Sequence, residues 1–212
     1  MTRVRLSPQR PRPSLLRPPL QFTPYAWAKL VFLRDAGGTE VGGFGVSSER
    51  DLLLIEDVQL VQQRCGPTTV VFDDSSVADY FDRQIDLGLQ PERCGRIWIH
   101  THPGDSPLPS ATDERTFERS FQGPDWALMF ILARGGASYA RVRFRAGPGG
   151  QMRLPVQVAY EQPFEGTDHK AWLAEYEQNV TTAELSSRPA RLTREDDEFL
   201  ELFLSGQGAP WW

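Results

Sequence analysis

The sequence feature that most constrains the fold is a continuous apolar run over Trp126–Ala133. Its eight residues, Trp-Ala-Leu-Met-Phe-Ile-Leu-Ala, include no charged side chain, which is typical of a strand buried on both faces. An alternating segment, Ser138–Phe144, follows after an Arg-Gly-Gly turn and predicts a neighbouring strand. A strand buried on both faces needs structure packed against each side. We therefore expect a layered domain with this strand at its centre.

Local patterns predict helices and further strands on both sides of this central pair. Helices are expected at 24–35, 75–86, 110–121 and 167–185, with Ser75 or Ser76 capping the second. Strands are expected at 40–47, 52–61, 68–72, 96–100 and 156–160. Because strands alternate with helices and hairpins stand among them, the fold class is α/β, a sandwich around a mixed sheet.

The two ends of the chain differ from the middle. Residues 1–24 contain six prolines, five arginines and no acidic residue, and proline at this density opposes helix and sheet. We expect a flexible Arg/Pro-rich arm at 1–23, either a plain tail or a basic arm that docks on an acidic partner. One folded domain is expected at 24–187. A C-terminal extension at 188–212 has a charged stretch over 191–201 and ends in Trp-Trp.

Charge and cysteine content exclude several classes of protein. The net charge of −5 disfavours a general nucleic-acid binder, which is usually basic. No run approaches about 18 consecutive apolar residues, so no membrane-spanning helix is predicted. Two cysteines, Cys65 and Cys94, are too few for the disulfide framework of a small secreted domain. A cytoplasmic protein is the simpler expectation.

Two of the three histidines stand one residue apart, in a His-x-His-Pro string. His100 and His102 come at the end of a predicted strand, and residues i and i+2 of a strand point to the same face. Both imidazoles can therefore aim at one point. Pro103 then turns the chain, because proline cannot continue the pairing. Alone, such a pair is more often polar surface than a metal site.

Ser110 and Asp113 follow at the start of the next predicted helix. Asp113 would lie in the first turn, where the helix dipole favours a carboxylate. Two imidazoles and one carboxylate make three ligands with an open fourth position, as in catalytic zinc sites. The plainer interpretation is an N-cap at Ser110 with an acidic residue at N3. The combination with the histidine pair, in a chain so poor in histidine, favours the metal site.

The whole string, His-x-His-Pro-x6-Ser-x2-Asp, resembles the JAMM motif of the JAB1/MPN/Mov34 (MPN+) zinc metalloproteases. That motif includes an upstream glutamate in the pattern Glu-apolar-x-Gly, and Glu40, followed by Val-Gly-Gly, fits it. The motif spans 40–113, and the predicted strand order is compatible with the family over 24–160. The resemblance implies an MPN/JAB-type α-β-α sandwich around a mixed, mostly antiparallel, cytidine-deaminase-like sheet. It also implies that 24–187 is the catalytic domain.

The resemblance assigns a role to each matching residue. His100, His102 and Asp113 would bind one Zn²⁺ per chain. Glu40 would act as general base toward the zinc-bound water and pass the proton to the leaving amine. Ser110 would hydrogen-bond the oxyanion, or the water before it attacks. This chemistry is sound, because zinc lowers the pKa of bound water to about 7. A carboxylate that acts as a general base increases the reaction rate by about 10²–10⁴-fold.

Rival assignments fit the sequence less well. Glu49 and Glu56 are other candidate bases, but neither begins a Glu-apolar-x-Gly pattern. Metallo-β-lactamases need a further histidine close behind the pair, amidohydrolase barrels need a longer chain, and zinc deaminases need Cys-x-x-Cys. Of the histidines only His169 is left over, so no second metal is predicted and His169 is expected at a surface helix start.

Family resemblance also implies a substrate. Catalytic JAMM proteins mostly cut the isopeptide bond after the C-terminal glycine of a ubiquitin-like protein, and others trim precursors or release sulfur carriers. The lack of extra domains suggests the compact prokaryotic, bacterial type of deubiquitinase-like isopeptidase, working beside E1-like and E2-like partners. A Gly-Gly tail would bind extended along a strand edge. The candidate walls of that approach are 104–109 and 62–69.

Two alternatives remain open at this stage. Many MPN domains have lost the metal and act as non-catalytic scaffolds, which the intact motif disfavours. A peptide or sulfur-carrier-processing metallohydrolase is the other, and it predicts cleavage of short peptides without a folded partner.

Overall fold

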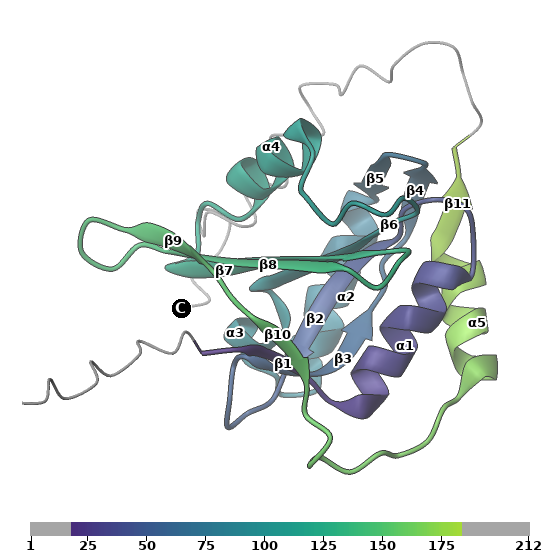
Figure 1. Ribbon diagram of the computed structural model, residues 1–212, viewed down its shortest axis with the longest axis horizontal. Coiled ribbons are helices and arrows are strands. Elements are labelled where there is room, and N and C mark those ends of the chain that lie inside the picture. The colour runs from purple at the N-terminus through teal and green to yellow at the C-terminus, as the bar shows by residue number, and fades with distance from the viewer. Residues whose placement is uncertain (1–17, 184–212) are drawn as a thin grey trace, which may run out of the picture.

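The apolar run forms β7 (Trp126–Ala133), and seven of its eight residues are buried. In the computed structural model, which describes residues 18–183, β7 lies in the middle of the main sheet (Figure 1). It pairs parallel with β6 (Ile97–His102) and antiparallel with β8 (Ser138–Phe144). The prediction of a buried central strand is therefore confirmed.

The remaining elements surround this central group of strands. The helices are α1 (Pro24–Asp35), α2 (Asp74–Asp86), α3 (Pro91–Cys94), α4 (Ala111–Ser120) and α5 (His169–Asn179). The other strands are β1 (Leu20–Phe22), β2 (Gly42–Ser47), β3 (Leu54–Gln59), β4 (Gln63–Gly66), β5 (Thr69–Phe72), β9 (Gly150–Arg153), β10 (Val156–Val158) and β11 (Val180–Thr182). In the part of the chain that the structure describes, no helix is long and apolar enough to cross a membrane.

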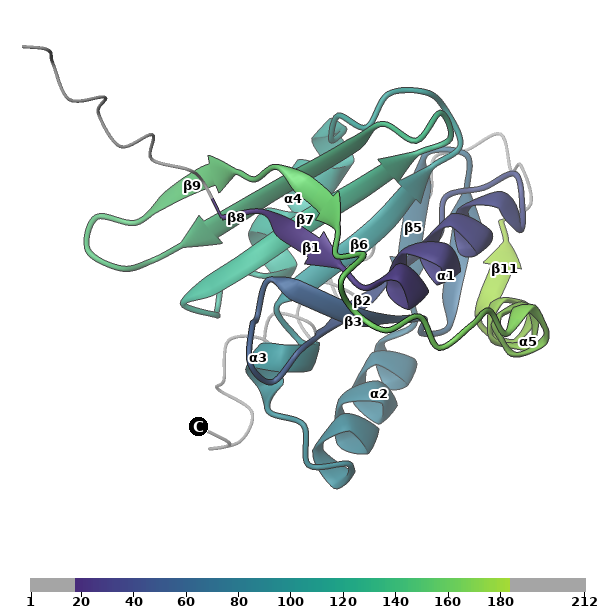
Figure 2. The ribbon, with the colours of Figure 1, turned by 60° about the horizontal axis from the view of Figure 1, so that its bottom comes forward.

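Eight strands form one mixed sheet in the order β10-β1-β3-β2-β6-β7-β8-β9. Four of its seven strand contacts are antiparallel and three are parallel. Strands β9 and β10 lie at opposite ends of this order, yet only Leu154 and Pro155 separate them in sequence. The sheet is therefore curled until its two ends meet (Figure 2). The expected mixed α/β class is confirmed.

Alternating side chains of the central strands divide the core into two layers. The concave face packs against α1, and it includes Ile97, Ile99, Leu128 and Phe130. The convex face packs against α2, α3 and α4, and it includes Trp98, Met129 and Ile131. Helices therefore cover both faces of the sheet, as a sandwich requires.

The glycines of β2 allow a second, small sheet to lie on it. The order of this sheet is β11-β4-β5. A Cβ atom at Gly42 would lie 2.9 Å from both Val70 and Phe72 of β5, which is closer than side chains tolerate. The side chain of Gln63 on β4 bonds both the amide and the carbonyl of Gly42, each at 2.8 Å. Glycine at this position thus lets β4 and β5 pack closely beside the start of β2.

Helix caps explain where two of the helices begin. Thr23 accepts a hydrogen bond from the amide of Ala26 at 3.1 Å, and Pro24 takes the first helical position of α1. The expected serine cap of α2 is wrong, because Asp73 is the N-cap and accepts from the amide of Ser76. The hydroxyl of Ser76 instead accepts from the backbone of Gln62 at 2.9 Å.

The expected boundary of the N-terminal arm needs correction. Leu20 and Phe22 are completely buried in β1, between β3 and β10 of the main sheet. Residues 20–23 therefore belong to the folded unit, whereas 1–17 lie outside the described residues. The sequence did not indicate this strand because three residues among prolines have little strand preference, and backbone bonds to Leu53 and Ile55 stabilise them.

Three further strands differ from the predictions. β4 and β9 lie in segments for which no strand was predicted. The helix predicted at 167–185 ends at Asn179, because the next residues form β11 and pair parallel with β4. The expected domain end at 184–187 and the extension at 188–212, with its two tryptophans, lie outside the described residues.

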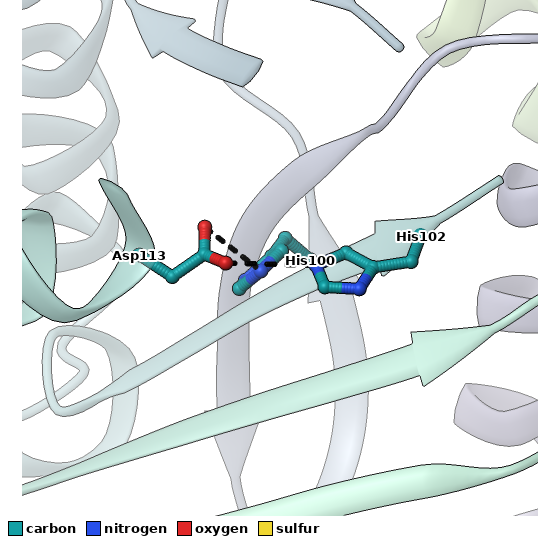
Figure 3. A group of neighbouring side chains, drawn as sticks. All are labelled: His100, His102 and Asp113. Atoms are coloured by element: carbon teal, nitrogen blue, oxygen red, sulfur yellow. Dashed lines mark ion pairs between the residues drawn. The ribbon is translucent and has the colours of Figure 1, made fainter. Parts of the chain in front are cut away.

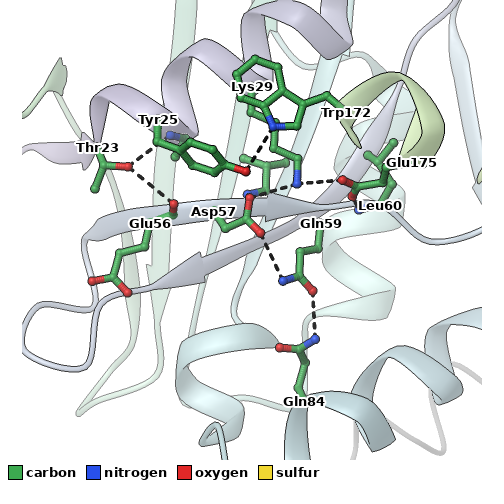
Figure 4. A network of polar contacts seen from close by, with 12 residues as sticks. Thr23, Tyr25, Lys29, Glu56, Asp57, Gln59, Leu60, Gln84, Trp172 and Glu175 are labelled. Carbon is green, nitrogen blue, oxygen red and sulfur yellow. Dashed lines mark hydrogen bonds and ion pairs between the residues drawn. The ribbon is translucent and has the colours of Figure 1, made fainter. Parts of the chain in front are cut away.

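A buried ion pair network joins α1, β3 and α5 (Figure 4). The ammonium of Lys29 lies 3.0 Å from Asp57 and 2.8 Å from Glu175, and its side chain is 5% exposed. Glu175 also accepts a hydrogen bond from the amide of Leu60 at 2.9 Å. These contacts fix α5 against the body of the fold.

Candidate metal centre

The two histidines of the motif lie at the end of β6, on the face that α4 covers. His100 is completely buried, and Trp98 stacks on its ring with centroids 4.4 Å apart. The ring centroid of His102 is 5.1 Å from that of His100. The Nδ1 atom of His102 lies 2.8 Å from the carbonyl oxygen of Ser106, which fixes the orientation of the ring. The predicted convergence of the two imidazoles is present.

Asp113 approaches the same point from the first turn of α4. Its Oδ1 lies 3.4 Å from Nε2 of His100, and its Oδ2 lies 3.6 Å from Nε2 of His102 (Figure 3). The capping box is also present: the Ser110 hydroxyl accepts from the amide of Asp113, and the Asp113 carboxylate accepts from the amide of Ser110. The helix cap and the candidate metal site are therefore compatible, because the cap orients the Asp113 carboxylate toward the histidines.

The donor atoms of these side chains fit a divalent metal ion. The side-chain nitrogens Nδ1 and Nε2 of His100 and Nε2 of His102 are buried and have no hydrogen-bond partner, an arrangement that costs free energy unless a ligand satisfies it. One donor atom from each of His100, His102 and Asp113 can be chosen so that all lie within 4.8 Å of one another. Ligands about 2.1 Å from a tetrahedral zinc ion would lie roughly 3.4 Å apart. The observed contacts of 3.4 and 3.6 Å match that spacing.

Burial and the neighbouring charges set the protonation of the three side chains. Burial lowers the pKa of His100, which favours the neutral imidazole that a metal needs. Burial also acts to lower the pKa of His102, but Asp113 and the carbonyl of Ser106 raise it overall. Burial acts to raise the pKa of Asp113, but the two histidines hold it well below its usual range. Asp113 is therefore an ionised carboxylate.

Glu40 lies beside the histidines, immediately before β2. It is 5% exposed, and its Oε1 is 3.6 Å from Nε2 of His102. Burial raises the pKa of Glu40 to about 8, with His102 acting against this and Asp113 adding to it. The amide of Glu40 donates to the carbonyl of Gly66 at 2.9 Å, which fixes its backbone. The predicted base is thus a buried carboxyl beside the site with a raised pKa.

Ser110 is the least enclosed of the five motif residues. It is exposed at the N-cap of α4, and its hydroxyl oxygen accepts from the amide of Asp113 at 3.2 Å. A hydroxyl that accepts one bond still has a proton to donate. Its role toward an oxyanion stays a prediction.

The backbone around Glu40 and β2 is held by two further residues, which the sequence did not indicate. Thr101, between the two histidines, accepts a hydrogen bond from the amide of Val41 at 3.0 Å. Gln63 fixes Gly42 through both atoms of its side-chain amide. Gln63 carries no sequence signal, because its segment was expected to be a loop. The position of Thr101 inside the motif was the available signal for it.

The rival bases lie elsewhere. Glu56 pairs with Arg93 at 3.4 Å and its side chain is 44% exposed, and Glu49 is exposed in the turn after β2. Glu40 alone of the three is buried.

The remaining histidine and the cysteines do not contribute donors to this centre. His169 begins α5 on the surface and stacks on Phe32, as its position predicted. Cys65 and Cys94 are buried free thiols. Burial raises the pKa of Cys65 to about 12 and that of Cys94 to about 11, so neither is a reactive thiolate near neutral pH.

Comparisons with known proteins add little beyond this geometry. No family model matches the chain, and no curated protein matches it. Among solved structures, the chain is similar to one described as "JAMM: A Metalloprotease-like Zinc Site in the Proteasome and Signalosome". The likeness has 14% sequence identity and a TM-score of 0.34, and it covers 66% of this chain and 99% of the other.

The residues of the candidate site form a consistent set. A curled mixed sheet with helices on both faces is consistent with an MPN/JAB-type α/β fold. Within residues 18–183, His100, His102 and Asp113 form a group able to hold a metal ion. A buried carboxyl and a hydroxyl stand beside that group. Two imidazoles and a carboxylate suit zinc, and three protein ligands with an open fourth position are typical of catalytic zinc sites.

Proposed function

We propose that this protein is a zinc-dependent isopeptidase that cleaves after the C-terminal glycine of a ubiquitin-like protein. The reaction either releases that protein from a conjugated target or processes its precursor. The observation that carries the proposal is the convergence of His100, His102 and Asp113, with unpartnered buried nitrogens, next to a buried glutamate. The JAMM-like spacing of these residues in the sequence supplies the reaction class.

In this proposal each side chain has a defined task. Zinc held by His100, His102 and Asp113 would supply Lewis acidity at the scissile carbonyl and would lower the pKa of water in the site. Glu40 takes a proton from the attacking water and returns it to the leaving nitrogen. The Ser110 hydroxyl donates to the oxygen that becomes negative. Asp113 and the histidines hold the metal.

The surroundings of the site support an extended substrate tail. β5 is an edge strand of the small sheet, and it packs beside the start of β2, next to Glu40. A peptide can add to such an edge through backbone hydrogen bonds. The exposed segment 104–109 lies between β6 and α4 and forms the other candidate wall. A tail of two glycines has no side chains to clash between the two.

The proposed partners are a ubiquitin-like protein and its conjugates, together with E1-like and E2-like proteins of the same pathway. A cytoplasmic location and the bacterial, compact type of enzyme belong to the same proposal. Neither a membrane nor nucleic acid is a proposed partner, because the chain has a net charge of −5 and 28 acidic residues.

The test uses the full chain loaded with zinc and two probes. One is a linear fusion of a ubiquitin-like protein ending in Gly-Gly to a reporter domain, and the other is a short peptide ending in the same residues. We expect cleavage of the fusion after the second glycine, located by mass spectrometry and reversibly abolished by a chelator. Glu40→Gln serves as the matched inactive control.

Other outcomes select the alternatives. Equal cleavage of the short peptide would contradict the need for a folded substrate and favour a peptide or sulfur-carrier-processing metallohydrolase. A folded chain that binds no zinc and cleaves neither probe would contradict the proposal and favour a non-catalytic MPN scaffold.

A further inference from the structure

A short connection leads from α1 to Glu40, the proposed base. It comprises residues 36–39, in which Gly37 and Gly38 are exposed and Thr39 is buried. Glu40 follows directly and is 5% exposed. Because only two residues separate Gly37 from Glu40, a displacement of the connection reaches the backbone of the base.

Tyr176 on α5 lies against this connection. A Cβ atom at Gly37 would lie 2.1 Å from the hydroxyl oxygen of Tyr176 and 3.2 Å from its ring atom Cζ. Glycine is therefore the residue that lets the tyrosine approach the backbone so closely. Burial raises the pKa of Tyr176, and a contact with Thr39 acts against this. The tyrosine hydroxyl thus lies beside both Gly37 and Thr39.

The helix that carries Tyr176 is firmly anchored at this point. Glu175, its neighbour in sequence, pairs with the buried Lys29 at 2.8 Å. One turn earlier, Trp172 is 1% exposed, and its indole donates to a tyrosine hydroxyl of α1 at 3.1 Å (Figure 4). If Tyr176 and Gly37 are forced apart, the exposed connection is therefore the side that moves.

The backbone of Glu40 is also held from β4, which leads back to the same part of the fold. The amide of Glu40 donates to the carbonyl of Gly66 in β4 at 2.9 Å. β4 pairs parallel with β11, the strand that directly follows α5. The amide of Ala183 after β11 donates to the carbonyl of Cys65 at 2.8 Å. α5 and β11 therefore support the chain on both sides of Glu40.

We propose that Tyr176 is a positioning residue, which holds the connection 36–39 so that the carboxyl of Glu40 faces the metal site. This inference rests on the proposed function, because it takes Glu40 as the base of that reaction. A base must lie within hydrogen-bond reach of the proton that it takes. A displacement of about 1 Å in an active site can lower the rate by about 10²-fold.

The test begins with Gly37→Ala in the full chain loaded with zinc. The added methyl group and the Tyr176 hydroxyl must separate by about 1 Å to avoid overlap. With the fusion substrate, we expect kcat to fall by about 10–100-fold. KM and zinc content should stay at their wild-type values.

Gly38→Ala is the matched control. Gly38 is closer to Glu40 in sequence, yet a Cβ atom there would meet nothing within 4 Å. This variant should keep the wild-type kcat. A loss in Gly37→Ala but not in Gly38→Ala would therefore come from the contact with Tyr176 and not from a stiffer connection.

Tyr176→Phe provides a second variant that separates positioning from stability. It removes the hydroxyl that meets the new methyl group, so Gly37→Ala with Tyr176→Phe should recover most of the wild-type kcat. A residue that only stabilises the fold would add its own loss instead. Amide signals of Glu40 and Val41 in nuclear magnetic resonance spectra should shift in Gly37→Ala and return in the double variant, a measurement that needs no activity.

Two results would overturn the proposal. One is a folded Gly37→Ala chain with the wild-type kcat and unshifted Glu40 signals, and the other is a loss that Tyr176→Phe does not reverse. A wild-type chain that cleaves no fusion would contradict the proposed function alone. The amide signals of Glu40 would then still decide whether Tyr176 positions it.

Discussion

The side chain of Asp113 has two structural roles, one in the cap of α4 and one in the candidate metal site. One carboxylate closes the cap of α4 and also faces two histidines. The convergence of His100, His102 and Asp113 could be predicted, because the spacing of donor types in the sequence indicates it. The contacts of Gln63 and Thr101 with the chain around Glu40 were not predictable, because they exist only once β2, β4 and β6 are assembled.

The role of Glu40 gives a residue-scale prediction. Glu40→Gln should bind zinc as the wild type does, because Glu40 is not one of the three proposed ligands. Cleavage of the fusion substrate should fall by about 10²–10⁴-fold, because the amide cannot accept the proton. Zinc content and the cleavage rate are measured on the same preparation. A variant that kept the wild-type rate would show that another group is the base.

At the scale of elements, the predictions were best where a pattern alone decides the structure. β7 and β8 were predicted with the observed bounds, since burial on two faces or one face determines their patterns. β4 and β9 were missed because each is a strand of only four residues, paired in a hairpin with its neighbour in sequence. β11 was missed because it has three residues and pairs with β4, which is distant in sequence. β1 was missed for the same reason, because its three residues stand among prolines and pair with β3 and β10, which are distant in sequence.

The attachment of α4 gives a prediction at this scale. Glu114 follows Asp113 and forms the ion pair with Arg141 that holds the first turn of α4 on β8. Glu114→Gln should weaken zinc binding by about 10–100-fold, as for other residues that orient ligands. A competition titration with a chelating dye measures this.

Glu118→Gln is the matched control for that change. Glu118 lies one turn further along α4 and is exposed. Glu118→Gln should leave the affinity for zinc unchanged. Equal effects of the two variants, or none at Glu114, would show that this ion pair does not position Asp113.

At the scale of the whole molecule, Lys29 joins α1, β3 and α5 through two carboxylates. Burial acts to lower the pKa of Lys29, but Asp57 and Glu175 raise it overall. The folded state therefore holds this proton more tightly than the unfolded chain. The stabilisation is fully present below the unfolded pKa of about 10.4 and is lost as the pH rises through the folded pKa.

Lys29→Met tests this network. Removal of the cation leaves Asp57 and Glu175 without their partner, and the free energy of unfolding near pH 8 should fall by about 3 kcal/mol. The difference in the free energy of unfolding between the wild type and the variant should become smaller above about pH 10.5. Urea unfolding across this range measures it. A difference that stayed constant, or grew with pH, would contradict the raised pKa.

Elemental analysis of the purified protein shows whether His100, His102 and Asp113 bind one zinc ion. We expect about one zinc per chain in the wild type and almost none in Asp113→Ala, with both chains folded by circular dichroism. A folded wild type that takes up no zinc when the metal is supplied would contradict this expectation. Full occupancy in Asp113→Ala would contradict the assignment of the third ligand.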